Sequence, residues 1–391
     1  MLPAFPAPRI AISLLFLLNG FLVGSWSARI PEFKERMGID ESEIGLVILV
    51  FGLGSLTIMP LNGWLISRLG TFWMMMPQAV AICFFFMVLT AAPDLVWALI
   101  VIFFAGGLIG GMDVAMNSNA VIVERNMARA IMSSCHGFWS LGAGLGSLAG
   151  GFLVPELGLW GHAFTVTTLS LMLVTFAWPM AHKDEGQTAE QKASAKTNSV
   201  FRSLLPWLIG LMALGSMFPE GAVVDWANLY LREEKGAGPF IASMAFAGFA
   251  FTMAVLRFAG DSVRMRFGAL KTFKVSAYIA AVGLALAVVS PWLWGTLLGF
   301  AIAGIGIANT VPICFSAAGN LKGYPPGAAI ALVTVLGYSG LLVVPPLIGF
   351  VAQLIGFSPV FLTLAGVLVL VSFGSYLLAD ADLPDEEPLE T

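Results

Sequence analysis

The chain has 391 residues, of which 58% are hydrophobic and 11% are charged, and its mean hydropathy is +0.90. Soluble domains carry about 25% charged residues, so this composition excludes an ordinary soluble protein. The net charge of -4 says little about partners, because the acidic excess lies in the terminal segment 380–391. We expect that segment to be a solvated tail.

Apolar runs of about 20 residues, the length that crosses a bilayer, recur along the whole chain. Twelve such runs lie at about 10–30, 43–66, 73–91, 95–121, 131–154, 160–181, 203–230, 239–262, 271–290, 293–318, 327–352 and 357–379. The expected fold class is therefore an all-α integral membrane protein with twelve transmembrane helices. We expect a multi-pass protein of the inner (plasma) membrane.

The distribution of basic residues predicts the orientation in the bilayer. Twelve spans put both termini on one side, and a cytoplasmic N-terminus places most of the 19 basic residues on the cytoplasmic side. The positive-inside rule then favours cytoplasmic N- and C-termini. The basic residues left on the other side are Arg29, Lys34, Arg36, Arg232 and Lys235.

Sequence features recur with an offset of about 195 to 200 residues. Trp26 near the end of the first span corresponds to Trp226 in the seventh, and the turn Arg68-Leu69-Gly70 corresponds to Arg266-Phe267-Gly268. We therefore predict two pseudo-symmetric six-helix halves, 1–181 and 203–379. A cytoplasmic linker at 182–202 joins them, and the tail 380–391 follows.

Glycines repeat along the fifth predicted span at Gly142, Gly146, Gly150 and Gly151. Small residues at this spacing allow two transmembrane helices to approach closely. We interpret them as packing positions.

Several motifs together resemble the major facilitator superfamily, in particular its fucose-permease-like and YbjJ-type branch. The turn 63–70 is similar to the superfamily signature after the second helix, and Gly111-Met112-Asp113-Val114-Ala115-Met116-Asn117 resembles the fourth-helix motif of fucose-permease-like transporters. The other motifs are His136-Gly137-Phe138-Trp139-Ser140-Leu141-Gly142, Glu220-Gly221, Asp225-Trp226 and Pro345-Pro346-Leu347-Ile348-Gly349. This resemblance implies two parallel repeats with a substrate site between them.

The signature aspartate of that family is replaced by Ser67 in the first copy and by Met265 in the second. These departures put in doubt the cytoplasmic latch that the aspartate forms in the family, although Arg68 remains as a gating candidate. Asp261 lies four residues after Arg257, a spacing that lets the two pair on one helix face. We predict a gating pair, and a substrate-binding Arg257 is the alternative.

Asp113 is the main candidate for proton coupling, because a charge at membrane depth is costly and persists mainly where it serves a cavity, a partner or a proton path. The resemblance implies the same role, since the matching acid of fucose permease couples protons. The alternative is a permanently hydrogen-bonded structural acid. His136 lies at a comparable depth and could form a relay with Asp113. Packing near the cytoplasmic mouth is the alternative for His136.

Pro219 and Gly221 flank Glu220 in the middle of the seventh span. Because proline and glycine weaken a helix, we predict an interrupted helix and a hinge there. Glu220 is then a substrate ligand or a second protonation site. Asp225 lies nearer the periplasmic mouth, where it could bind substrate or act in a gate.

Other polar and aromatic residues at membrane depth are candidate substrate ligands. Amides bind polar groups, whereas a lone intramembrane asparagine often only joins two helices. Tryptophans stack on rings or sugar faces, and they also anchor helix ends at the membrane interface. The candidates are Asn19, Asn117 and Asn309 for the amides, and Trp26, Trp139 and Trp226 for stacking.

These features predict a proton-coupled secondary transporter of a small polar organic solute, with a sugar-like compound as one option, that works by symport. Efflux of drugs or metabolites by proton antiport is the alternative. A transporter-like sensor or a membrane-embedded enzyme is remote, because the chain has no catalytic motif or long soluble appendage. We expect no enzyme activity, no metal or other cofactor besides a proton gradient, no nucleic-acid partner, and a monomer in the lipid bilayer.

Overall fold

The computed structural model describes residues 6–127, 131–184, 204–319, 321 and 326–381, and the regular structure of this described part is entirely helical. The elements are α1 (Ala7–Met37), α2 (Glu41–Leu69), α3 (Thr71–Cys83), α4 (Phe85–Ala91), α5 (Leu95–Met127), α6 (Met132–Ala177), η1 (Trp178–Met180), α8 (Leu204–Glu233), α9 (Pro239–Phe267), α10 (Ala269–Val289), α11 (Leu293–Ile307), α12 (Thr310–Gly319), α13 (Pro326–Ile355), α14 (Phe357–Phe373) and η3 (Gly374–Ala381). Within these residues, ten helical stretches are long and apolar enough to cross a membrane.

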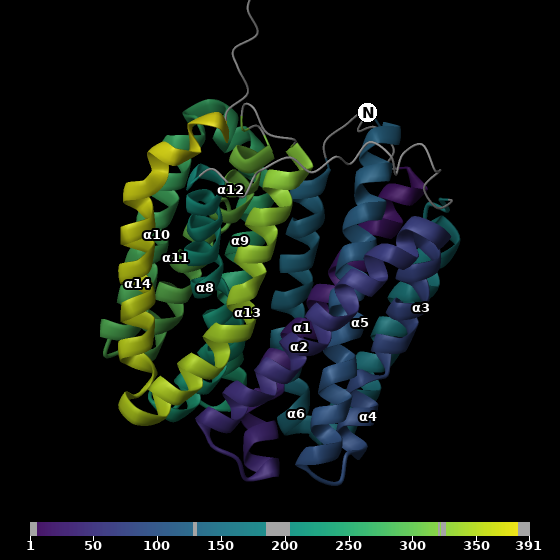
Figure 1. The fold of residues 1–391 in the computed structure, drawn as a ribbon. Helices are drawn as coiled ribbons and strands as arrows, with labels where there is room; N and C mark the ends of the chain where they lie inside the picture. Colours follow the sequence, from purple (N-terminus) through teal and green to yellow (C-terminus); the bar gives the residue numbers. More distant parts are fainter. Residues whose placement is uncertain (1–5, 128–130, 185–203, 320, 322–325, 382–391) are drawn as a thin grey trace, which may run out of the picture.

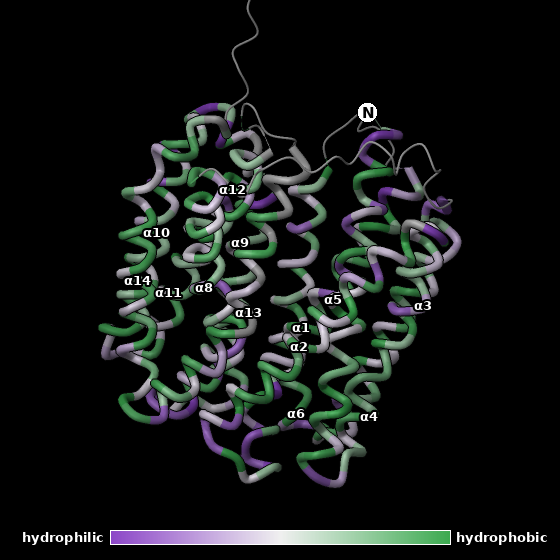
Figure 2. The backbone as a smooth tube through the Cα atoms, viewed as in Figure 1, coloured by the Kyte–Doolittle hydropathy of each residue, from purple (hydrophilic) through white to green (hydrophobic). Residues whose placement is uncertain are grey.

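The helices form two groups that lie side by side, α1 to α6 in one and α8 to α14 in the other (Figure 1). We name the two ends of the bundle by their residues. The linker end contains Arg9 and Asp184, and the distal end contains Met37, Glu233 and Ile355. Hydrophilic residues gather mainly toward these two ends, and the middle of the bundle is predominantly hydrophobic (Figure 2). This pattern fits a protein whose middle is surrounded by lipid.

The predicted break between the ranges 131–154 and 160–181 is confirmed, because α6 is kinked at Gly158, which has a non-helical φ of 68°. Two other predicted spans are each divided into two helices. The helices α3 and α4 are separated at Phe84, and α11 and α12 are separated next to Asn309. Hydropathy predicts that a segment is apolar but not where its backbone bends, because bends depend on local backbone geometry and on neighbouring helices.

The predicted interruption of the seventh span is wrong. The helix α8 runs from Leu204 to Glu233 and remains helical through Pro219, Glu220 and Gly221. A proline inside a helix removes one backbone hydrogen bond, and neighbouring helices and small local adjustments accommodate this loss in a membrane protein. A hinge function for this segment stays a prediction.

The glycines of α1 and α6 bring these two helices into backbone contact. A Cβ atom at Gly20 or Gly24 would lie 1.9 Å from the carbonyl oxygen of Trp139 or Ala143. A Cβ atom at Gly142 would likewise lie 2.1 Å from the carbonyl oxygen of Leu17. The predicted packing role of the α6 glycines is therefore confirmed for Gly142.

We expect Gly142→Ala to destabilise the protein by about 2 kcal/mol, because the new methyl group meets a backbone carbonyl that cannot rotate away. Gly63→Ala on α2 is the matched control, since no atom lies within 4 Å of its added Cβ. Alanine is also the better helix former, so the control should be neutral or slightly stabilising. Thermal unfolding of the purified variants measures both effects. Equal stability of the two variants would contradict the close contact.

The two groups of helices touch along α6 and α9. The Cβ positions of Gly137 and Gly144 face the rings of Phe258 and Phe251 at 2.8 Å and 2.9 Å. Farther toward the distal end, the Ser147 hydroxyl donates to a carbonyl oxygen of α9 at 2.9 Å. At Gly137 and Gly144 a glycine faces an aromatic ring, so rings make this part of the contact between the groups.

The second contact between the groups joins α2 and α13. A Cβ atom at Gly45 would lie 2.8 Å from the Cα atom of Pro346 and 2.9 Å from the carbonyl oxygen of Pro345. The two prolines of the Pro345 motif therefore pack directly against α2.

Candidate substrate and proton site

A buried ion pair joins α9 to α8 and reaches the other group of helices. The Nη2 atom of Arg257 lies 3.1 Å from Oε1 of Glu220, and its Nη1 atom donates to the hydroxyl of Ser140 on α6 at 2.7 Å. The hydroxyl of Ser133, also on α6, donates to the carbonyl oxygen of Arg257 at 2.7 Å. The guanidinium group of Arg257 thus contacts both groups of helices at once.

The predicted pair of Arg257 with Asp261 stays a prediction, because the side chain of Asp261 lies outside the described residues. The described partners of the Arg257 guanidinium group are Glu220 and Ser140. The sequence did not single out Ser140, because a serine in an apolar helix usually bonds only to its own backbone. Ser140 does so as well, donating to the carbonyl oxygen of His136 at 3.0 Å.

Asp113 and Asn117 lie together on α5. The side-chain nitrogen of Asn117 donates to the carbonyl oxygen of Asp113 at 2.8 Å and to its Oδ1 atom at 3.1 Å. Both side chains are half-buried. The predicted roles of Asp113 in proton coupling and of Asn117 in substrate binding stay predictions.

His136 lies four residues before Ser140 on α6, and its ring packs edge-on against Phe16 at a centroid distance of 5.3 Å. This contact joins it to α1. The proposed relay between His136 and Asp113 stays a prediction.

Two predicted substrate ligands bind each other. The indole nitrogen of Trp139 donates to Oδ1 of Asn19 at 2.9 Å, and the Asn19 amide donates to the carbonyl oxygen of Ile109 at 3.4 Å. Asn19 is 1% exposed. These bonds join α1, α5 and α6, so in this structure the amide of Asn19 serves helix packing.

The other tryptophans on the predicted list are buried against aromatic rings. Trp26 packs against Phe33 and Phe85 at centroid distances of 5.6 Å and 5.9 Å. Trp226 is fully buried and lies 5.5 Å from Phe357, but one edge of it also lines a pocket with Asp225. Only Trp226 of these two is therefore placed beside a cavity by the described contacts.

Two of the remaining candidates lie near the linker end. The guanidinium group of Arg68 stacks over the ring of Trp64 at 4.0 Å, on the exposed side of α2. Asn309 is buried at the break between α11 and α12, where a Cβ atom at Gly260 would lie 2.5 Å from its Oδ1 atom. This close approach joins Asn309 to α9.

The start of the predicted linker caps α3. Both carboxylate oxygens of Asp184 accept from the backbone nitrogen of Thr71, at 3.0 Å and 2.9 Å, and the Thr71 hydroxyl donates to Oδ1 at 2.6 Å. Asn119 completes this cluster by donating to Thr71 at 2.7 Å. The turn that resembles the superfamily signature is therefore tied to the linker by an acid outside the signature.

Charged residues connect the two groups at the distal end. Arg232 at the end of α8 pairs with Glu32 and, at 2.8 Å, with Glu35. Lys34 pairs with Glu41 at 2.5 Å and also with Glu233 across the interface. We call these six residues the distal charge cluster. In the sequence, Lys34 and Arg232 stand out only as exceptions to the positive-inside pattern.

We expect Arg232→Ala to favour opening at the distal end, because it removes two ion pairs between the groups. The two partly buried pairs together contribute about 1 kcal/mol, so the ratio of open to closed molecules should rise about five-fold. Distances between spin labels at the exposed positions Leu46 and Leu354 measure this ratio. Arg36→Ala is the control, because the described hydrogen bonds of Arg36 are to Leu89 and Ala92 within its own group. Equal distance distributions in both variants would contradict a closing role.

A family model described as the Major Facilitator Superfamily matches residues 12–321. The uncharacterized transporter y4wD of Sinorhizobium fredii is 33% identical over 86% of this chain and 89% of its own length. An MFS-type transporter of Yersinia pestis is 31% identical over 93% and 94%. The multidrug resistance protein MdtG of Escherichia fergusonii is 27% identical over 53% of each chain.

Solved structures show the same fold at low sequence identity. A mutant form of the nucleoside transporter NupG superimposes with a TM-score of 0.75, at 16% identity and with 94% of this chain and 98% of that chain covered. The D-xylose-proton symporter gives a TM-score of 0.71 at 15% identity, with 94% and 96% covered. The match to the family model and the full-length relatives agree with the helical architecture: the chain belongs to the Major Facilitator Superfamily.

Proposed function

We propose that the chain is a proton-coupled secondary transporter that moves a small polar organic solute across the inner membrane by alternating access. The observation that carries this proposal is the Arg257–Glu220 pair, whose guanidinium group also binds Ser140 in the other group of helices. A buried charge pair between two halves that move against each other responds directly to a polar solute or a proton.

In this proposal residues 1–181 and 203–379 are the two rocking halves. They cross the membrane twelve times in total, counting α6 as two arms on either side of Gly158 and counting α3 with α4, and α11 with α12, as one crossing each. Asp113 binds the transported proton, and Glu220 with Arg257 contacts the solute. The distal charge cluster closes one side of the pathway while the solute is exchanged on the other.

Uptake by symport is the direction we favour, because the motif around Asp113 resembles that of fucose-permease-like transporters. Efflux by proton antiport is the second candidate, and the similarity to MdtG favours it. Both directions use the same carboxylates and differ only in whether proton and solute cross together or in turn.

Transport by the purified protein in proteoliposomes tests the proposal. The vesicles enclose a pH-sensitive dye, and solutes from a panel of sugars, nucleosides and amines are added outside. A coupled solute should change the internal pH, acidifying the vesicles in symport and making them more alkaline in antiport. Vesicles without protein, and vesicles with a protonophore, are the controls. Solute movement that never moves protons would rule out proton coupling.

The orientation gives a separate prediction. If both termini are cytoplasmic, reporter tags at the N-terminus, the C-terminus and position 190 should report the cytoplasm, and a tag near Lys34 should report the periplasm. A position 190 on the periplasmic side would contradict the arrangement of two halves joined by a cytoplasmic linker.

A further inference from the structure

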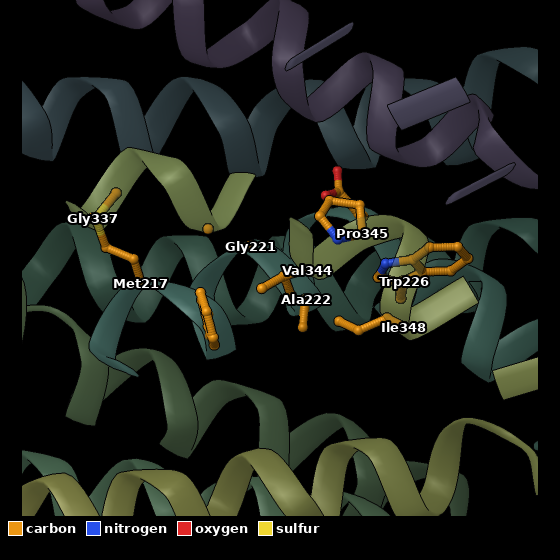
Figure 3. A pocket seen from close by; sticks show the side chains of 11 residues that line it. Met217, Gly221, Ala222, Trp226, Gly337, Val344, Pro345 and Ile348 are labelled. Atoms are coloured by element: carbon orange, nitrogen blue, oxygen red, sulfur yellow. The ribbon is translucent and has the colours of Figure 1, made fainter. Parts of the chain in front are cut away.

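A narrow pocket lies between α8 and α13, and its walls are almost entirely apolar. Figure 3 shows Val344, Pro345, Ile348 and Trp226 near one end of it, with Met217 and Gly337 toward the other. Asp225 is the only ionisable residue among those that line it. A single carboxyl group therefore determines the charge of this pocket.

Among the described contacts, the carboxylate of Asp225 has no hydrogen-bond or ion-pair partner, although it is half-buried. Glu220, five residues earlier on the same helix, is in contrast paired with Arg257. A buried carboxylate without a partner is costly in an apolar environment. The pocket thus contains a carboxyl group whose charged form the described side chains leave without a counter-charge.

The basic residues on the helices around this pocket are engaged elsewhere. Arg257 binds Glu220 and Ser140, and Arg232 at the end of α8 binds Glu32 and Glu35. A cation that pairs with the Asp225 carboxylate must therefore come from outside the described side chains.

The aromatic and glycine residues of the pocket set its shape. A Cβ atom at Gly340 would lie 2.3 Å from the ring of Phe218, and one at Gly337 would lie 2.7 Å from the sulfur of Met217. The glycines therefore let the Phe218 ring and the Met217 sulfur line the wall together with Trp226. A carboxylate beside aromatic rings and a thioether is the environment that binds ammonium groups, through charge pairing and cation–π contact.

The pocket also lies beside the contact between the two halves. Pro345 lines it and packs against Gly45 of α2, and Gly349 on the same helix contacts both Trp226 and the backbone of Glu41. An occupant of the pocket thus lies against the same α13 segment that contacts the other half.

We propose that the transported solute carries a protonated or quaternary amine, which pairs with Asp225 while its apolar part lies against Trp226 and Phe218. This inference rests on the proposed transport function and specifies the chemical class of its solute. The amine is an organic monocation, because one carboxylate faces it and the rest of the wall is apolar.

Binding of a matched pair of probes to the purified full chain tests the inference. Choline carries a quaternary ammonium group, and 3,3-dimethyl-1-butanol is its neutral isostere. Isothermal titration should show that choline binds at least about ten-fold more tightly, because only the cation gains the charge pair with Asp225. Asp225→Asn should remove this preference and leave binding of the alcohol unchanged.

Two further variants separate the charge of Asp225 from its structural role. Asp225→Glu keeps the charge and should keep a preference for choline. Glu156→Gln removes an exposed carboxylate of α6 outside the pocket and should bind as the original protein does. Thermal unfolding confirms that each variant is folded.

Three results would overturn the inference: equal binding of the two probes, absence of choline binding to the original protein, or an unchanged preference in Asp225→Asn. Each of these is independent of proton coupling. Movement of a neutral solute with protons in the vesicle assay would leave the proposed function intact while excluding the amine.

Discussion

Asp113→Asn should abolish accumulation of the solute against its gradient while exchange between equal concentrations continues. With a pH difference of one unit, one coupled proton sustains about ten-fold accumulation, because each pH unit is worth 1.36 kcal/mol. Asparagine keeps an oxygen that accepts from Asn117, but it cannot bind a proton for transport. We therefore expect the accumulation ratio of the variant to fall to about one.

Radiolabelled solute in proteoliposomes measures both accumulation and exchange. Glu156→Gln is the control, because it removes an exposed carboxylate of α6, whereas Asp113 lies on α5. Full accumulation by Asp113→Asn would exclude this residue as the obligatory carrier and shift the role to Glu220. A variant that no longer folds would identify Asp113 as structural.

Arg257→Ala should cost both stability and transport. It leaves the half-buried Glu220 carboxylate without its cation, and breaking a buried pair in this way costs about 3–5 kcal/mol. We expect a decrease of this size in the free energy of unfolding and a loss of transport of at least about a hundred-fold. Ser140→Ala removes only one hydrogen bond of the same guanidinium group and should cost about 1 kcal/mol.

The double variant Arg257→Met with Glu220→Gln distinguishes stability from function. Because it removes both charges together, most of the stability should return. Transport should remain lost if the pair binds the solute or responds to the proton. Recovery of transport along with stability would show that the pair only holds the helices together.

The apolar helices were predictable because each must span the bilayer with its backbone hydrogen bonds satisfied internally. The range predicted at 95–121, for example, lies within α5 at Leu95–Met127. The separation of α3 from α4 at Phe84 and the continuity of α8 through Pro219 were not predictable from hydropathy. Both depend on how neighbouring helices pack against the backbone.

The candidate site was predicted as a set of residues but not as a set of contacts. Glu220 and Arg257 were both singled out, but not as a pair. The two residues lie on different helices and are 37 positions apart in the sequence. Asn19 and Trp139 were proposed as separate solute ligands, and the structure joins them by a hydrogen bond. Residue type indicates what a side chain can bind, whereas the partner that it binds is decided by tertiary packing.

The distal charge cluster could have been found from the repeat. Arg232 is 200 residues from Glu32, so the symmetry of the chain places the two at equivalent helix ends. The offset of 200 residues, combined with the opposite charges of Arg232 and Glu32, predicts a contact between these two residues. The charges alone do not predict it, because lysines and arginines near helix ends are also common at membrane interfaces.

These opposite signs determine which half-molecules can associate. If two copies of the first half met in the same geometry, Glu32 and Glu35 of one copy would face Glu32 of the other, and two copies of the second half would oppose Arg232 with itself. Like charges placed together disfavour such pairings, whereas the unlike pair is attracted. At this end the two groups of helices are therefore complementary in charge to each other, so separately synthesised halves would sort into mixed pairs.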